Sequence, residues 1–206
     1  TCGVILIGVP VGFLTAVFLS KMAPKKLRTV MESAVSLLAG IPSVVYGWIG
    51  LTILVPFIKD LFDLKFGFSV LSAGIVLAVM IYPTITSLSA DAIRSIPKSF
   101  RQASYGLGAT RWQTISQVVI PASKSGLMTA IVLGLARAFG EALAVAMVIG
   151  KMKAFPESLL SPTTNLTAAI ASDMGGAMEG SEYNIALWSM ALLLFIISLV
   201  FIFIIH

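Results

Sequence analysis

The chain has 206 residues, of which 58% are hydrophobic and only 11% are charged, and its formal net charge is +5. Soluble domains carry about 25% charged residues, so this composition, with a mean hydropathy of +1.00, excludes an ordinary soluble domain. The excess of positive charge is interpreted as a record of membrane topology and gives no indication of nucleic-acid binding. The composition predicts an all-α integral membrane protein.

Long apolar stretches divide the chain into predicted transmembrane spans. A helix needs about 20 residues to cross a bilayer, and five stretches reach that length: residues 1–20, 33–58, 69–90, 125–150 and 183–205. The chain opens at Thr1 inside one such stretch and closes at His206 directly after another. We therefore expect a polytopic helical bundle, with five spans seen here and six in a longer protein.

The second predicted span is interrupted near its middle. Gly40, Pro42 and Gly47 stand where the helix should be continuous, and proline removes a backbone donor. A helix that restarts after Pro42 would present free N–H groups to an anion. A proline kink that serves only helix packing explains the same residues equally well. Tyr82-Pro83 repeats the pattern more weakly and favours a kink.

A polar segment, residues 91–124, separates the third and fourth predicted spans. Residues 99–102 (Ser-Phe-Arg-Gln) and 110–113 (Thr-Arg-Trp-Gln) both fit the capping box, in which hydroxyl and amide side chains bond the first N–H groups of a helix. The segment therefore predicts two short helices that are hinged at Gly108 and end at Pro121.

The fourth predicted span contains Arg137 and Glu141, one helical turn apart. A charged residue at mid-membrane costs about 2.5–3.5 kcal/mol on insertion scales and usually marks a functional site. Arg137 could offer a bidentate fork to a tetrahedral oxyanion, with Glu141 orienting it or controlling release. A structural ion pair that holds two helices together is the alternative.

The segment between Lys151 and Glu182, called the outer segment below, is rich in turn-forming residues. A short apolar helix is predicted within it at residues 166–174. The chain's one cysteine, Cys2, and its one histidine, His206, offer no metal-ligand set, and we expect no metal site.

The distribution of lysine and arginine predicts the orientation. Placing residues 91–124 in the cytoplasm leaves only Lys59, Lys65, Lys151 and Lys153 outside, whereas the inner side then holds nine cations, namely Lys21, Lys25, Lys26, Arg28, Arg94, Lys98, Arg101, Arg111 and Lys124. Cytoplasmic loops carry such an excess of positive charge.

The spacing Gln102-Ala103-Ser104-x3-Gly108-x9-Val118-x-Ile120-Pro121 resembles the E-A-A-x3-G-x9-I-x-L-P signature of the membrane subunits of ABC importers. In that family the segment forms the coupling helices that sit in a groove of a cytoplasmic ATPase. The resemblance implies coupling roles for Gln102, Ala103, Ser104, Gly108, Ala109 and Arg111. Gln102 replaces the acidic residue of the family, which puts a charged contact at that position in doubt.

A narrower resemblance covers nearly the whole chain. Residues 39–47 (Ala-Gly-Ile-Pro-Ser-Val-Val-Tyr-Gly) and 136–145 (Ala-Arg-Ala-Phe-Gly-Glu-Ala-Leu-Ala-Val) are similar to segments of the phosphate-specific transport permeases, most of all the PstC-like ones. This resemblance implies the type I ABC importer permease fold in one transmembrane domain, residues 1–206. It also implies a substrate pathway that includes Arg137, Glu141, Ser43 and Tyr46.

The same resemblance implies the setting of the protein. The expected partners are a PstA-like permease subunit, a PstB-like ATPase dimer and a PstS-like phosphate-binding protein that meets the outer segment, in a bacterial or archaeal cytoplasmic membrane. A lid that packs over the helix ends is an equal interpretation of that segment. The chain is not expected to be an enzyme or to hold a cofactor, because ATP and Mg²⁺ belong to the partner ATPase.

Other functions stay open at this point. The chain could be a PstA-like subunit or a permease for sulfate or molybdate, which are also tetrahedral oxyanions. An ion-coupled secondary transporter would use Arg137 and Glu141 as a proton relay and would not need the coupling segment. A structural scaffold subunit is disfavoured because it rarely needs buried charge.

Overall fold

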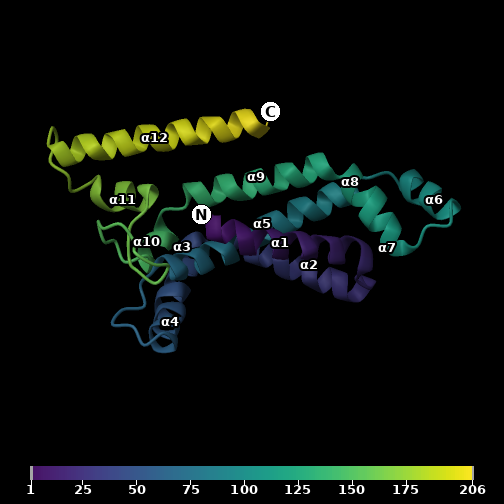
Figure 1. The fold of residues 1–206 in the computed structure, drawn as a ribbon, viewed down its shortest axis with the longest axis horizontal. Helices are drawn as coiled ribbons and strands as arrows, with labels where there is room; N and C mark the ends of the chain where they lie inside the picture. Colours follow the sequence, from purple (N-terminus) through teal and green to yellow (C-terminus); the bar gives the residue numbers. More distant parts are fainter. Residues whose placement is uncertain (1, 206) are drawn as a thin grey trace. The chain divides into compact units, whose positions relative to one another are not determined.

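The computed structural model describes residues 2–205, and the side chains of residues 7–203. Thr1 and His206, the residues at which the chain opens and closes, lie outside the described residues. Regular structure in the described part is helical, apart from one isolated bridge between Gly150 and Thr163 (Figure 1). The prediction of an all-α protein is confirmed.

The helices follow one another closely along the chain. In order they are α1 (Cys2–Val17), the π-helix η1 (Phe18–Met22), α2 (Lys25–Gly40), α3 (Ser43–Ile49), the π-helix η2 (Gly50–Leu54), α4 (Val55–Leu61), α5 (Val70–Arg94), α6 (Lys98–Gly106), α7 (Arg111–Gln113), the π-helix η3 (Thr114–Val119), α8 (Ile120–Ala122), α9 (Lys124–Gly140), α10 (Leu143–Val148), α11 (Leu166–Asp173) and α12 (Glu182–Ile205).

The described residues form two compact units. Unit 1 comprises residues 41–80 and 136–205 with the first residues of α1, and unit 2 comprises residues 5–40 and 81–135. The boundary between them falls inside α1, α5 and α9 as well as between α2 and α3.

Close contact between α3 and α10 organises unit 1. Gly47 makes this approach possible, because a Cβ there would lie 2.7 Å from the Ala144 Cα. One turn later, a Cβ at Gly50 would lie 2.6 Å from Val76 and 2.9 Å from Val148. Small residues at such positions let helix backbones pack tightly in a membrane.

Unit 2 is held by an apolar core and by two more glycine contacts. The core joins α1, α5, η3 and α9 through Ala16, Val17, Ala90, Ile93, Ile115, Val119 and Leu127. A Cβ at Gly126 would lie 2.6 Å from the Ala92 side chain, and one at Gly134 would lie 2.6 Å from Ile85. The α5 and α9 helices therefore meet closely in this unit.

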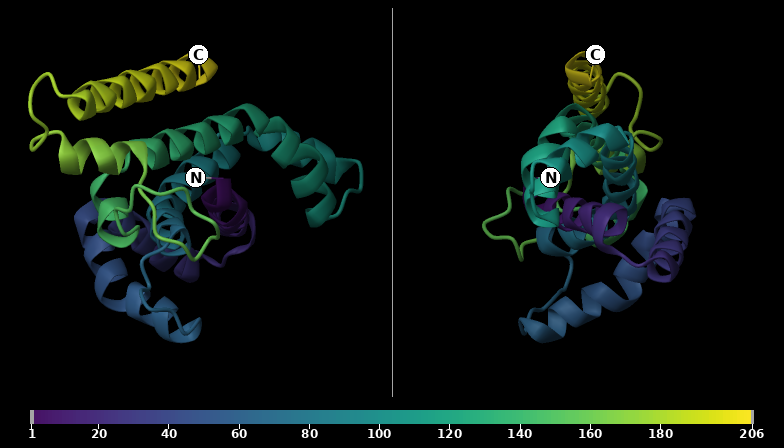
Figure 2. Two further views of the ribbon diagram at one scale, coloured as in Figure 1. Left: turned by 60° about the vertical axis from the view of Figure 1, so that its left-hand side comes forward. Right: turned by 90° about the vertical axis from the view of Figure 1, so that its right-hand side faces the viewer.

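Three helices in the described part of the chain are long and apolar enough to cross a membrane: Ser43–Leu61, Val70–Arg94 and Glu182–Phe203. The first comprises α3, η2 and α4 and can be followed in dark blue in Figure 2. A fourth span is reached if Arg111–Ala122 and Lys124–Gly140, which meet at a bend of 67°, are taken as one. The first predicted span, residues 1–20, coincides with α1 and η1, whose described side chains form the apolar helix Ile7–Met22.

The boundaries of two predicted spans are wrong. Residues 33–40 belong to α2, a separate helix that begins at Lys25 and carries polar residues on successive turns. The span predicted at 125–150 ends at Gly140 as a helix, and α10 begins anew at Leu143. In contrast, α5 continues through Pro83 as one helix.

We expect Gly47→Ala to lower the stability of unit 1 by about 1–3 kcal/mol, the usual cost of forcing a methyl group into a close-packed contact. The nearest atom is the backbone Cα of Ala144, which cannot move aside as a flexible side chain can. The measurement is the thermal unfolding midpoint of the purified protein in detergent. Gly40→Ala is the matched control, because a Cβ at Gly40 would meet no described atom within 4 Å; equal midpoints for the two variants would contradict the packing argument.

Candidate functional site

The interruption in the second predicted span lies at Ile41 and Pro42. Gly40 is the last residue of α2, Pro42 has the extended backbone of an N-cap, and Ser43 opens α3. Gly47 lies inside α3 and belongs to the contact with α10 described above. It therefore serves helix packing and is not part of the interruption. Ser43 and Tyr46, one turn apart, are half-buried and buried.

Arg137 lies near Tyr46. Its positive charge acts on the Tyr46 hydroxyl group, although the two residues lie far apart in the sequence. Arg137 is half-buried in the last turn of α9, and Tyr46 is buried on α3. A guanidinium and a phenol at this place could both donate hydrogen bonds to an oxyanion.

Glu141 lies between α9 and α10, in the break Glu141–Ala142, and not on a continuous helix with Arg137. Its Oε1 accepts a hydrogen bond of 3.0 Å from the Ala144 N–H in the first turn of α10. Its backbone carbonyl accepts a hydrogen bond of 2.8 Å from the Thr167 hydroxyl of α11. The Glu141 carboxylate therefore caps α10, and the Glu141 carbonyl holds α11. The i, i+4 spacing of Arg137 and Glu141 in the sequence gave no signal of either role.

A tight turn opens the outer segment. Gly150 has φ +96° and Lys151 has φ +52°, both in the left-handed region. A Cβ at Gly150 would lie 2.7 Å from the Pro162 side chain, so glycine serves both the turn and the close approach. The helix predicted at 166–174 is confirmed as α11, with Asn165 accepting a hydrogen bond of 2.7 Å from the Ala168 N–H.

An ion pair with an aromatic neighbour fastens the start of the outer segment to its helix α11 and to α12. The Lys153 ammonium lies 3.2 Å from Asp173 Oδ2 and 3.9 Å from the centre of the Tyr183 ring, and the Tyr183 hydroxyl donates to Asp173. These three residues also line a cavity of about 270 Å³ beside α11. The Tyr183 hydroxyl, then the Lys153 ammonium, holds the pKa of Asp173 below its usual value, whereas contacts with Tyr183 and then Asp173 raise that of Lys153.

The polar segment 91–124 starts two helices, as predicted, but only one of them with the predicted cap. Thr110 accepts from the Gln113 N–H at 3.3 Å while Gln113 Oε1 accepts from the Thr110 N–H at 2.8 Å, so the second capping box is confirmed. The first is wrong: α6 begins at Lys98 directly after Pro97, which leaves Ser99 within the first turn. Proline fixes the chain direction ahead of the serine.

The two helices are joined at Gly108 and bonded to each other. Gly108 has φ +82°, which favours glycine. The hydroxyl groups of Ser104 and Thr114, both buried, lie 2.9 Å apart in a hydrogen bond between α6 and η3. The helical path ends at Ala122, one residue beyond Pro121, so the predicted end of the pair is confirmed to within one residue.

Large apolar side chains of this segment point to the solvent. Leu107 is 90% exposed, and Phe100, Tyr105 and Trp112 are 45–63% exposed. Gln102, Ala103 and Arg111 are exposed beside them, and Ala109 is half-buried. Exposed apolar groups gathered in this way are typical of a protein-docking surface.

The fold and these residues define a multi-pass membrane protein with an exposed segment, residues 91–124, between apolar helices. Residues 8–206 match the family described as "Binding-protein-dependent transport system inner membrane component". The chain belongs to this family.

Two curated relatives are similar to nearly the whole of this chain. The chain is 54% identical over 201 residues to the protein named "Probable ABC transporter permease protein YqgH" of Bacillus subtilis, covering 98% of this chain and 65% of that protein. It is 37% identical to the "Phosphate transport system permease protein PstC" of Haemophilus influenzae, covering 96% and 69%. The chain thus spans about two thirds of the length of these relatives.

A solved structure shares the fold. The inward-facing MetNI methionine ABC transporter matches with a TM-score of 0.69 over 99% of this chain and 87% of that one, at 22% identity. The predicted type I ABC importer permease fold is therefore confirmed, and the recognition of a PstC-like permease is confirmed by sequence similarity.

We expect acid to loosen the outer segment. The folded-state pKa of Asp173 is depressed, so its contribution to stability is complete above the unfolded pKa of about 3.9 and is lost as the pH falls through the lower folded value. The folded-state pKa of Lys153 is raised, so its contribution to stability is lost as the pH rises through that value. The contact of Lys153 with Asp173 and Tyr183, called the latch, is therefore strongest between the folded-state pKa values of Asp173 and Lys153. Hydrogen exchange of residues 151–173 measures this, and Asp173→Asn should exchange faster at neutral pH. An Asp173→Asn protein with unchanged protection would show that the latch contributes nothing.

Proposed function

We propose that the chain is a membrane permease subunit of an ATP-driven phosphate importer and forms half of the translocation pathway. The observation that carries the proposal is the half-buried Arg137 in the last turn of α9, within electrostatic reach of the buried Tyr46, in a chain similar to a phosphate permease. A permanent positive charge in such a place is costly unless it serves a partner or a passing anion.

The substrate is proposed to meet Arg137 first. The planar guanidinium matches two oxygens of a tetrahedral oxyanion, and it keeps its charge at every physiological pH. Tyr46 can add a hydroxyl donor, and Ser43, one turn earlier on α3, can add another. Glu141 is occupied at the start of α10 and is proposed to hold α10 and α11 in place around the pathway.

Coupling is proposed to run through residues 91–124, which we place in the cytoplasm on the basis of the lysine and arginine distribution. The exposed apolar residues of α6 and α7 are suited to a groove on a PstB-like ATPase dimer. ATP and Mg²⁺ would be bound there, and this chain is proposed to hold no cofactor. Gln102 is exposed on α6, where its neutral amide can still bond a polar group of the partner.

Two further partners are proposed. A PstA-like permease subunit would complete the pathway, and α12, which is apolar on all sides and largely exposed, offers one surface to lipid or to that subunit. A PstS-like binding protein would dock on the outer segment.

ATP binding would then close the ATPase dimer and move α6 and α7. This movement would open or close access to Arg137, as in an alternating-access mechanism.

Arg137→Ala is expected to abolish phosphate uptake into proteoliposomes that contain the complete transporter, while complex assembly stays intact. Arg137→Lys should restore little, because a lysine keeps the charge but loses the two-pronged geometry. Lys124→Gln removes an exposed cation from the start of the same helix and should transport normally. Uptake at the normal rate by Arg137→Ala would refute the substrate role, and competition with sulfate and molybdate would reveal which oxyanion is preferred.

Gly108→Val is expected to uncouple the transporter. A branched side chain is strained at φ +82°, which costs about 1–2 kcal/mol and reshapes the junction of the two docking helices. The readouts are recovery of the ATPase in a pull-down and ATP hydrolysis stimulated by the binding protein. Gly106→Ala is the matched control, because it lies two residues away with open space around it and without a positive φ. Normal stimulation in Gly108→Val would contradict the proposed coupling.

A further inference from the structure

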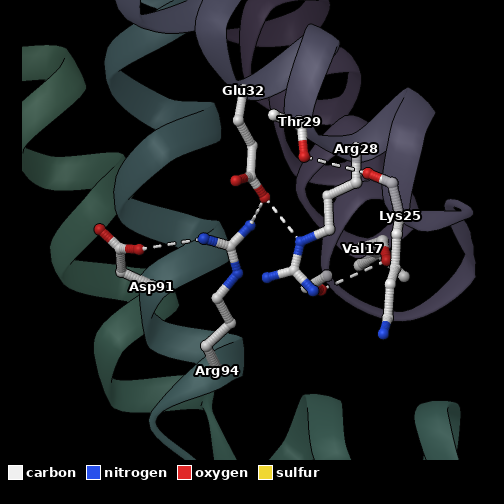
Figure 3. A network of polar contacts seen from close by, with 8 residues as sticks. Val17, Lys25, Arg28, Thr29, Glu32, Asp91 and Arg94 are labelled. Carbon is white, nitrogen blue, oxygen red and sulfur yellow. Dashed lines mark hydrogen bonds and ion pairs between the residues drawn. The ribbon is translucent and has the colours of Figure 1, made fainter.

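Four partly buried cations gather in unit 2. They are Lys21 in η1, Arg28 in α2, Arg94 at the end of α5, and Arg101 in α6. Figure 3 shows how Arg28 and Arg94 converge on one carboxylate, that of Glu32. Arg28 Nε lies 2.7 Å from Glu32 Oε1, and the Arg94 guanidinium bonds the same oxygen.

The carboxylates nearby do not balance these cations. Glu32 Oε1 serves two arginines at once, and contacts with Arg28 first, followed by Arg94, hold the pKa of Glu32 below its usual value. Asp91 lies 3.7 Å from Arg94 and is 72% exposed, so water weakens its effect. Four cations against two carboxylates leave the group with a net charge of +2.

Donors in the group lack acceptors. The Nε atoms of Arg94 and Arg101 are buried, and neither has a hydrogen-bond partner among the described residues. A buried donor without an acceptor costs about 1–3 kcal/mol, more when the group is charged. Such donors are satisfied by ordered water or by a bound group, and these two belong to cations, which favour an anion.

Lys21 lies within electrostatic reach of the other three cations. Burial, then the charges of Arg101, Arg28 and Arg94, lowers the pKa of the Lys21 amine to about 8. Lys21 lies outside the three candidate spans, one residue before the end of the apolar helix Ile7–Met22, and Arg94 is the last residue of the apolar helix α5. Both cations thus stand where an apolar helix ends, which is the level of lipid headgroups in a bilayer.

We propose that Lys21, Arg28, Arg94 and Arg101 form a binding site for a phosphate group, and that its ligand is the headgroup of an acidic phospholipid. A phosphate oxygen can accept from the unpartnered Nε donors, and its negative charge offsets the excess of the cations. Free inorganic phosphate has the same chemistry and is the second source that the experiment must separate. The position of Lys21 and Arg94 at the ends of apolar helices favours the lipid.

The test uses the full-length protein in its purified complex. Bound phosphatidylglycerol is measured by native mass spectrometry against phosphatidylcholine, with the double variant Lys21→Gln, Arg101→Gln. Each cation removed near a headgroup should weaken binding about fivefold, so the double variant should lose roughly 25-fold. Phosphatidylcholine binding should not change.

Two controls distinguish a site from general positive charge. Lys26→Gln and Lys98→Gln remove exposed cations from α2 and α6, the helices of Arg28 and Arg101, and should leave phosphatidylglycerol binding unchanged. Lys21→Arg, Arg101→Lys keeps the charges and should retain most of the binding, which shows that the loss does not come from misfolding.

Inorganic phosphate provides the second arm, measured on the same variants by isothermal titration calorimetry. If the double variant loses phosphate binding but keeps its phosphatidylglycerol, the site is a phosphate site whose ligand is free, and the lipid assignment is overturned. If neither ligand is affected, or if the Lys26 and Lys98 controls lose as much lipid as the double variant, the whole proposal is overturned.

Discussion

The structure depends on one constraint: every backbone N–H and C=O group inside a membrane must find a partner within the protein. An unbroken helix meets this demand by itself, so each interruption among the apolar helices needs other hydrogen-bond partners for its backbone groups. At Pro42 the carbonyl accepts a hydrogen bond of 3.0 Å from the Val45 N–H. Between α9 and α10 the Glu141 side chain and the Thr167 hydroxyl supply the missing partners. The interruptions are therefore stabilised features of the fold.

These interruptions and the glycine contacts belong to one arrangement in unit 1. Gly47 and Gly50 let α3 and η2 press against Ala144, Val76 and Val148. The break before α10 places that short helix in the contact, while Arg137 stays in the last turn of α9 with its charge acting on Tyr46. Close packing of small residues thus holds the surroundings of a charged residue that packing alone would exclude.

The sequence predicts well those features that depend on a local signal. The capping box at Thr110, the interruption at Pro42 and the helix α11 all follow from residues within a few positions of one another. Prediction fails where a neighbouring residue overrides the pattern, as Pro97 does for the Ser99 box. It also fails for α2, because a window free of charge from residue 33 onward hides a helix that begins at Lys25. Contacts between distant residues, such as Lys153 with Asp173 and Tyr183, leave no periodic trace in the sequence.

The buried bond between Ser104 and Thr114 has a mechanical consequence. The turn between them is itself closed by main-chain bonds, from the Gly108 N–H to the Tyr105 carbonyl at 3.0 Å and from the Ala109 N–H to the Ser104 carbonyl at 3.2 Å. A corner braced at both its tip and its base resists bending, so α6 and η3 are held to each other as one unit. A displacement of α6 would therefore reach η3, whose Ile115 and Val119 lie in the core of unit 2.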